Sequence, residues 1–350
     1  MRTTAQNSTA SPPVEGGGRY RAKDRGPMPA AGSRVRDYLE LIRPEHWIKN
    51  IVVFAGPAAG LKLASTAAIP SVLLTFVVFC LAASAGYAFN DVIDRRADEN
   101  HPTKRNRPVA GGRISPAAAL CISAALIGVA TAISLIWLPR GVTVVLLCYA
   151  TMVALYTIWL KSRIILDVII VAIGFVLRAL AGALAVGVPT SEWLVACVFT
   201  LCLFMGFGKR RCEIAMIGNV EELGEHRRTL VRYTPDLLNH LITVSAGIAV
   251  ITFLLYTLDS SGHPSPFRKQ HLFFTLPLVI YGIFRFAMLT ELGLYTGPTE
   301  IVLKDRATLW TVILWTACAM VVAYQGLLFG PEGLEGALGM RGPVSDIAPG

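Results

Sequence analysis

The segment FNDVIDRRADENHPTKRNRP, residues 89–108, carries acids and bases directly after an apolar run. If the helix of that run continues, Asn90, Asp94 and Asp98 recur every four residues on one face, and Asp91 joins them from one turn before. Like charges stacked at this spacing destabilise a helix unless a cation lies against them. Mg²⁺ prefers oxygen ligands and is usually held by one or two carboxylates together with substrate phosphates. The aspartates are therefore predicted to bind Mg²⁺ and to be catalytic, and Asn90 to contact substrate; the alternative is a solvated helix end.

Basic residues follow these acids in two places. Lys104 and Arg107 come soon after the aspartates, and Lys209, Arg210 and Arg211 follow the sixth apolar run. Ammonium and guanidinium groups bind phosphate oxygens directly, without a metal. The sequence therefore predicts a phosphate-bearing substrate bound by the first pair and by Lys209 and Arg210. For the second group, the alternative is a role in membrane topology alone.

An acid also lies inside an apolar run. Lys161 and Arg163 precede the fifth run, and Asp167 lies about one helical turn within it. An ionisable side chain at such a depth is costly and marks a candidate functional site. Asp167 and Lys161 are predicted to be catalytic, with Asp167 orienting a substrate hydroxyl or the Lys161 ammonium; the alternative is a buried ion pair with a neighbouring base. Arg178 lies deeper, where we expect a structural partner.

The elements that must position these residues are membrane helices. Hydrophobic residues make up 54% of the chain, charged residues only 16%, and the mean hydropathy is +0.56. A hydrocarbon layer of roughly 30 Å requires about 20 apolar residues per helix. Such runs recur about nine times, near residues 47–61, 69–89, 116–138, 142–160, 164–186, 193–207, 237–258, 272–289 and 309–328. The chain is predicted to be an all-α, polytopic membrane protein.

The distribution of Lys and Arg gives the expected orientation. These residues concentrate in alternate loops, which is typical of the cytoplasmic side. The pattern predicts a cytoplasmic N-terminus and places the acids and bases at the cytoplasmic edge. It also accounts for the formal net charge of +9 without a nucleic-acid partner. Residues 1–32 are predicted to be a disordered basic tail, 33–329 the transmembrane domain and 330–350 a flexible tail.

The motifs carry a resemblance to a known family. NDxxDxxxD from Asn90, followed by HPxKxxRP from His101, resembles the first aspartate-rich motif of the UbiA superfamily of intramembrane prenyltransferases, and RPxxWxKN from Arg43 fits as well. The resemblance covers residues 35–329. It implies a bundle of nine transmembrane helices with a diphosphate site in a cytoplasmic-side cavity, and Mg²⁺ as the cofactor.

At one position the sequence differs from typical members of the superfamily, and the difference indicates a particular branch. Typical members carry a second aspartate-rich motif after the sixth helix, whereas this chain has GFGKRRCEIAMIGN from Gly206. The sequence is more similar to the branch of the superfamily that acts on phosphoribosyl diphosphate and a polyprenyl (decaprenyl) phosphate. That similarity implies substrate-binding roles for Lys49, Tyr156 and Arg306 besides the residues above.

The resemblance implies transfer of 5-phosphoribose to the lipid phosphate with release of pyrophosphate, in the synthesis of an arabinan precursor of the cell wall. It also implies a plasma-membrane enzyme that works in contact with the lipid bilayer, and a homo-oligomer is possible. Two alternatives stay open: ordinary prenyl transfer from a prenyl diphosphate to an aromatic or other acceptor, and a non-catalytic membrane transporter. Clustering of the charged residues at one membrane edge favours an enzyme, since transport sites usually lie near the midplane.

Overall fold

The computed structural model describes residues 32–60, 62–101, 104–216, 233–259 and 269–329. Within these ranges every regular element is a helix and there is no strand. The elements are α1 Gly32–Ile42, η1 Pro44–Phe54, α2 Ala55–Ala59, η2 Lys62–Ala64, α3 Ile69–Ile93, α4 Arg95–Glu99, η3 Lys104–Asn106, α5 Pro116–Trp137, α6 Arg140–Ile158, η4 Leu160–Ser162, α7 Leu166–Ala185, α8 Glu192–Met216, α10 Pro235–Leu258, η6 Lys269–Thr275, α11 Leu276–Leu292, α12 Pro298–Lys304 and α13 Arg306–Phe329. The predicted tails, 1–32 and 330–350, lie outside the described residues apart from Gly32.

The apolar runs form membrane-length helices. Seven helices of the described chain are long and apolar enough to cross a membrane, and α12 with α13, bent by 87°, makes an eighth if the pair is one span. A helix satisfies its backbone hydrogen bonds internally, which a lipid environment demands. The all-α membrane bundle predicted from the sequence is confirmed; the count of nine spans is not.

The first predicted span is where the count differs. In place of one long α-helix, residues 47–59 belong to the tight 3₁₀ helix η1 and the short α2. Gly56, Pro57 and Gly60 fall in this run, and glycine and proline are the least favourable residues in a helix interior. The segment packs against α3 and α7 within the bundle.

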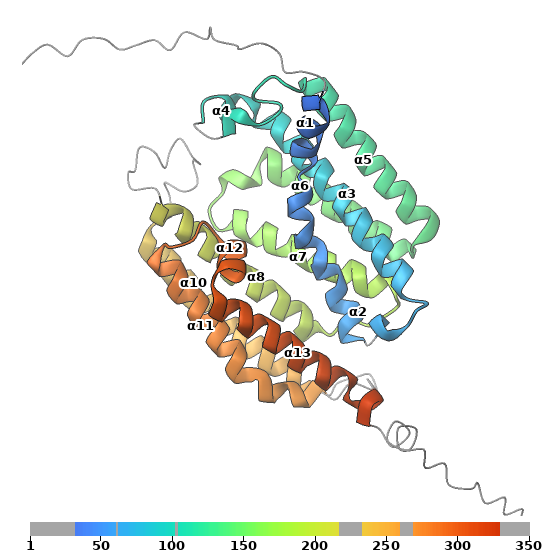
Figure 1. The fold of residues 1–350 in the computed structure, drawn as a ribbon, viewed down its shortest axis with the longest axis vertical. Coiled ribbons are helices and arrows are strands. Elements are labelled where there is room, and N and C mark those ends of the chain that lie inside the picture. The colour runs from blue at the N-terminus through green and yellow to red at the C-terminus, as the bar shows by residue number, and fades with distance from the viewer. Residues whose placement is uncertain (1–31, 61, 102–103, 217–232, 260–268, 330–350) are drawn as a thin grey trace, which may run out of the picture.

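Four clusters of buried apolar residues lie within the described ranges, and the two largest both include residues of α7. Figure 1 shows α7 in the middle of the bundle. In one core Val168 of α7 packs with residues of α8, α10, α11 and α12. In the other, Ala181 and Ala185 of α7 pack with η1, α3, α5 and α6. The two ends of α7 therefore link the N-terminal and C-terminal halves of the chain.

Close packing of η1 on α7 depends on Gly182. A Cβ at this position would lie 1.7 Å from the carbonyl oxygen of Val53, which is a backbone clash. Gly182→Ala is therefore expected to displace η1 and to lower the thermal unfolding temperature of the detergent-purified protein. Gly247→Ala is the matched control, because nothing lies within 4 Å of its added methyl group and alanine favours a helix. Equal unfolding temperatures for the two variants would contradict this account.

Candidate active site

Asp91 lies near the end of α3 and is 1% exposed. Its Oδ1 accepts a hydrogen bond from Arg43 Nη2 at 2.5 Å and another from Arg107 Nη1 at 3.3 Å. Its other oxygen, Oδ2, is buried and has no hydrogen-bond partner within the described residues. A buried acceptor without a partner is rare in folded proteins and requires an explanation, such as an ion that binds there.

The other two aspartates also meet basic side chains. Asp98 of α4 accepts from Arg107 Nη1 at 2.7 Å, so Arg107 bridges Asp91 and Asp98. Asp94 accepts from Lys161 Nζ. Burial raises the pKa of the Asp98 carboxyl, although Arg107 and then Lys104 act in the opposite direction. Asn90 is half-buried in α3.

These contacts bring the predicted acids and bases together without forming a metal site. No three metal-ligating side chains of the described ranges converge in a way that could hold an ion. The carboxylates instead form ion pairs with Arg43, Arg107 and Lys161. The ligand role of the aspartates stays a prediction, and the buried Oδ2 of Asp91 is the atom that fits it.

A polar pocket of about 340 Å³ opens beside these acids. Its lining includes Arg43 and Arg107, the two guanidinium groups that contact Asp91. The remaining lining residues are Glu40, Glu45, His46, Asn106 and Pro108. The two guanidinium groups in the lining are balanced by the carboxylates of Glu40 and Glu45, so the pocket alone does not identify the charge of a ligand.

Arg43 is a site residue that the sequence predictions did not single out. It has φ 52° and ψ 63°, a left-handed conformation that is uncommon for any residue but glycine. Its guanidinium lies 5.2 Å from the ring centroid of Tyr87 as well as against Asp91. Strained backbone of this kind clusters at functional sites. The available signal was its place at the head of the RPxxWxKN motif.

The segment that carries Arg107 is tied to α1. Arg113 contacts the carboxylates of Asp37 and Glu40 and donates to the backbone oxygen of Asn106 at 2.6 Å. The Arg113 guanidinium holds the pKa of the Glu40 carboxyl below its usual range. These contacts anchor the wall of the polar pocket on the amphipathic helix that precedes η1.

A second charged cluster surrounds Asp167, which is 0% exposed. Its Oδ2 accepts from Arg210 Nε at 2.9 Å and its Oδ1 from the Tyr233 hydroxyl at 2.8 Å. Arg210 also pairs with Glu213 at 2.7 Å and interacts electrostatically with Tyr156. The alternative for Asp167 was a buried ion pair with a neighbouring base; the structure has a buried ion pair, but its base is Arg210 of α8. Catalytic and substrate-binding roles for Asp167 and Arg210 stay predictions.

Two lysines lie at the same end of the bundle. Lys209 is half-exposed in α8, 3.7 Å from a carboxylate oxygen of Glu213. Lys209 and Arg178 are both close enough to Lys49 in η1 for their positive charges to repel its ammonium group. Positive charges gathered in this way favour an anion. Arg306, by contrast, is exposed at the start of α13, beyond the bend from α12.

Arg178 has a structural environment, as expected. It donates to Asn50 Oδ1 at 2.6 Å, to the Gly174 carbonyl at 2.8 Å and to the Tyr149 hydroxyl at 2.8 Å. Its guanidinium also lies over the rings of Tyr149 and Phe175. These bonds join η1, α6 and α7, and so help to hold the segment that carries Lys49.

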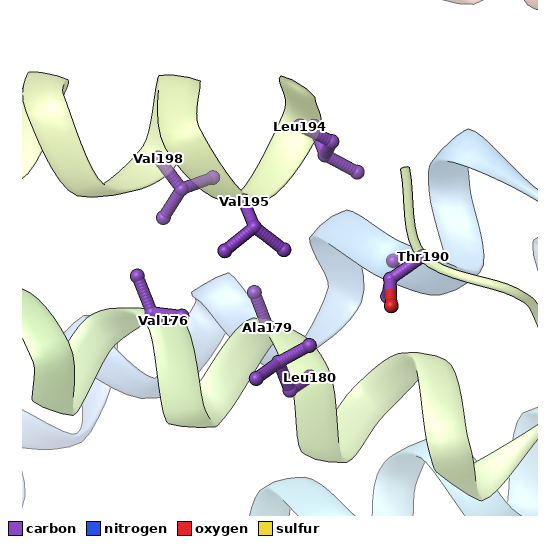
Figure 2. Close-up of a pocket in the computed structure, with 8 residues that line it drawn as sticks. Val176, Ala179, Leu180, Thr190, Leu194, Val195 and Val198 are labelled. Atoms are coloured by element: carbon purple, nitrogen blue, oxygen red, sulfur yellow. The ribbon is translucent and has the colours of Figure 1, made fainter. Parts of the chain in front are cut away.

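The apolar gap in Figure 2 is a different kind of space. It lies between the end of α7 and the start of α8, where Val176, Ala179 and Val195 face one another. Asp167 and Arg210 are at the opposite ends of these two helices. With a volume of about 10 Å³, the gap is too small for a substrate.

The fold is a bundle of membrane-length helices that carries clustered acidic and basic side chains. A family model described as the UbiA prenyltransferase family matches residues 51–295. Decaprenyl-phosphate phosphoribosyltransferase of Mycolicibacterium smegmatis is 34% identical, with 82% of this chain and 93% of that protein covered. The enzyme of the same name from Corynebacterium glutamicum is 33% identical, over 82% and 86%. The chain belongs to the UbiA prenyltransferase family.

A solved structure supports the fold assignment. The UbiA homolog from Archaeoglobus fulgidus, bound to DMAPP and Mg²⁺, has a TM-score of 0.64 at 17% identity and covers 82% of this chain and 99% of its own. At this identity the likeness shows the fold alone. Family membership makes the chain an enzyme, as predicted, and the transporter alternative has no support in these comparisons.

Proposed function

We propose that this enzyme transfers 5-phosphoribose from phosphoribosyl diphosphate to a polyprenyl phosphate, with release of pyrophosphate. The observation that carries the proposal is the similarity, along most of both chains, to enzymes named decaprenyl-phosphate phosphoribosyltransferase. The basic segment that begins at Lys209 supports it, because both substrates bring phosphate groups.

The transfer reaction does not require a strong general acid or general base from the protein. An oxygen of the lipid phosphate forms a bond to the anomeric carbon, the bond from that carbon to the diphosphate oxygen breaks, and its electron pair leaves with pyrophosphate. Attack from the opposite face gives inversion, to the β product. A phosphate monoester is already ionised near neutral pH, so no strong general base is needed. Catalysis then depends on positioning and electrostatics.

The aspartates suit a magnesium diphosphate. Asp91 near the end of α3, Asp94 directly after that helix and Asp98 in α4 supply carboxylate oxygens, and the buried Oδ2 of Asp91 lacks a hydrogen-bond partner within the described residues. When bound, Mg²⁺ would act as a Lewis acid that stabilises the charge on the leaving pyrophosphate. Arg107 and Lys161, which now neutralise these acids, would then contact the phosphate oxygens of the donor.

The remaining basic residues have a corresponding role. Lys104 follows the aspartates, and Lys49 and Lys209 lie near each other across η1 and α8. We assign the lysine pair to a phosphate that no metal neutralises. Tyr156 lies near Arg210, which holds Asp167. Asn90 and Arg306 are proposed substrate contacts on the resemblance alone.

The location follows from charge distribution. We propose a plasma-membrane enzyme with its N-terminus and active site on the cytoplasmic side, since Lys and Arg concentrate in the loops at this end. A soluble donor such as phosphoribosyl diphosphate is then accessible from the cytoplasm. A homo-oligomer and a role in arabinan synthesis remain part of the proposal.

A comparison of variants at Lys209 and Arg211 distinguishes a residue that binds phosphate from one that only sets the membrane topology. Arg211 donates to Asn239 at 3.2 Å and is occupied within the bundle. Lys209→Met is expected to raise the KM for one phosphorylated substrate about tenfold, since charge-assisted phosphate contacts are strong. Arg211→Met, the matched control, should change it less than about threefold. Steady-state pyrophosphate release with each substrate varied in turn gives both constants, and equal effects of the two changes would contradict the assignment.

The function itself is tested by dependence on both substrates. Purified protein with Mg²⁺ and phosphoribosyl diphosphate should release pyrophosphate only when decaprenyl phosphate is added. Release at the same rate without the lipid would indicate hydrolysis and contradict the proposal.

A further inference from the structure

Residues 160–167, which run from η4 into the first turn of α7, join the two charged clusters. At one end Lys161 contacts Asp94, which lies between α3 and α4. At the other end Asp167 pairs with Arg210 of α8. The position of this segment therefore sets the acidic cluster relative to the basic one.

The backbone of this segment is strained at Ile165. This residue has φ 67° and ψ −49°, and the N–H of Leu166 donates to the carbonyl of Ile164 at 2.7 Å. The angles and the hydrogen bond define a three-residue γ-turn of the rare, strained form. A positive φ at a β-branched residue is an outlier. Within the described ranges, Arg43 is the one other non-glycine residue with a positive φ, and it too lies at the site.

One hydroxyl group restrains this turn. Tyr233, just before α10, accepts the N–H of Ile165 at 2.6 Å and donates to Asp167 Oδ1 at 2.8 Å. Tyr233 is 3% exposed, and burial raises its pKa, so the hydroxyl keeps the proton that it donates. The same oxygen atom thus fixes the strained backbone and the buried carboxylate two residues later.

We propose that Tyr233 is a positioning residue for the transfer reaction, whose hydroxyl holds the Ile165 turn and the Asp167 carboxylate in register with Lys161. The proposal rests on the function assigned above. Without the hydroxyl, the turn relaxes toward an ordinary backbone conformation, and Lys161 and Asp167 move with it. In this proposal Tyr233 acts through Ile165 and Asp167 and not through a contact with substrate.

Tyr233→Phe removes the hydroxyl and keeps the ring. We expect kcat to fall about ten- to hundredfold, from the loss of a hydrogen bond to a charged group and a small misplacement of the site. The KM for the donor should change less than about threefold, because phosphate contacts are retained. Tyr256→Phe is the matched control: it is a buried tyrosine of α10 that packs with Phe253 and Leu272, away from Asp167. It should keep kcat within about twofold.

A second variant tests the turn directly. Glycine adopts a positive φ without steric penalty, so Ile165→Gly in the Tyr233→Phe background should recover part of the lost kcat. If Tyr233 acted only through packing, removal of the Ile165 side chain, which packs against the same core, would lower activity further. A loss in Tyr233→Phe with recovery in the double variant supports the proposal. An unchanged kcat in Tyr233→Phe, an equal loss in Tyr256→Phe, or no recovery would overturn it.

The outcome of this test does not depend on whether the proposed function is correct. All kcat ratios are measured on whichever transfer reaction the wild-type enzyme performs. A wild type that transfers a prenyl group would contradict the phosphoribosyl assignment, and the ratios would still decide the role of Tyr233.

Discussion

Asp94→Asn is expected to lower kcat by about 10²–10³-fold, the range found when one charge-stabilising group is removed from an active site. Asp94 is the accessible member of the acidic face, with a side chain 26% exposed and Lys161 as its ion-pair partner. Asparagine has nearly the same shape, so the change removes the charge and leaves the packing. The variant should therefore unfold at a temperature close to that of the wild type. Both quantities are measured on the same detergent-purified sample.

Asp259→Asn is the control for this prediction. Asp259 follows α10 at the end remote from Tyr233 and accepts a hydrogen bond from Ser191 at 3.1 Å. Its replacement should leave kcat within about twofold of the wild type. If Asp94→Asn retained wild-type turnover, the acidic face would be a structural helix end, and the proposed metal and donor site would be elsewhere.

Removal of divalent metal is expected to reduce turnover to the background rate. Without the metal the three aspartates face the basic groups of Arg43, Arg107 and Lys161, and the leaving pyrophosphate would lose its main electrostatic stabilisation. Turnover is measured after treatment with a chelator and again after Mg²⁺ is added back in excess. Recovery with Mg²⁺ is the expected result.

A binding measurement complements the chelation experiment. Mg²⁺ together with pyrophosphate should raise the thermal unfolding temperature of the wild type, because a ligand that binds the folded state stabilises it. The increase should be absent in Asp94→Asn. Full turnover in excess chelator would show that the basic residues alone stabilise the leaving group.

Much of the fold could be predicted because apolar length is a strong signal in a membrane protein. The run expected near 69–89 is the core of α3, and the run near 237–258 is α10 almost residue for residue. The apolar run at 47–61 was counted as a ninth span, because hydropathy does not distinguish a long membrane helix from a short helix such as η1 that packs inside the bundle. The close approach at Gly182 that holds η1 in place is a tertiary contact with no local sequence signal.

The candidate site was predictable where chemistry repeats at helical spacing. The aspartates of residues 90–98 could be predicted from their helical periodicity, and Lys161 could be predicted from its position just before the apolar run of α7. Their partners could not be inferred, because the pairing of Lys161 with Asp94 and of Arg210 with Asp167 joins residues more than forty positions apart. Tyr233 gave no signal at all, since its role arises from the strained turn at Ile165 that only the structure reveals.

The most direct test of the central claim is a competition between donors. Purified enzyme is given phosphoribosyl diphosphate and geranyl diphosphate in equal amounts, with Mg²⁺, decaprenyl phosphate and an aromatic acceptor, and the products are identified by mass spectrometry. The account predicts decaprenyl phosphate that carries one phosphoribosyl group, and no prenylated aromatic. A prenylated aromatic product, with the lipid phosphate unchanged, would contradict it.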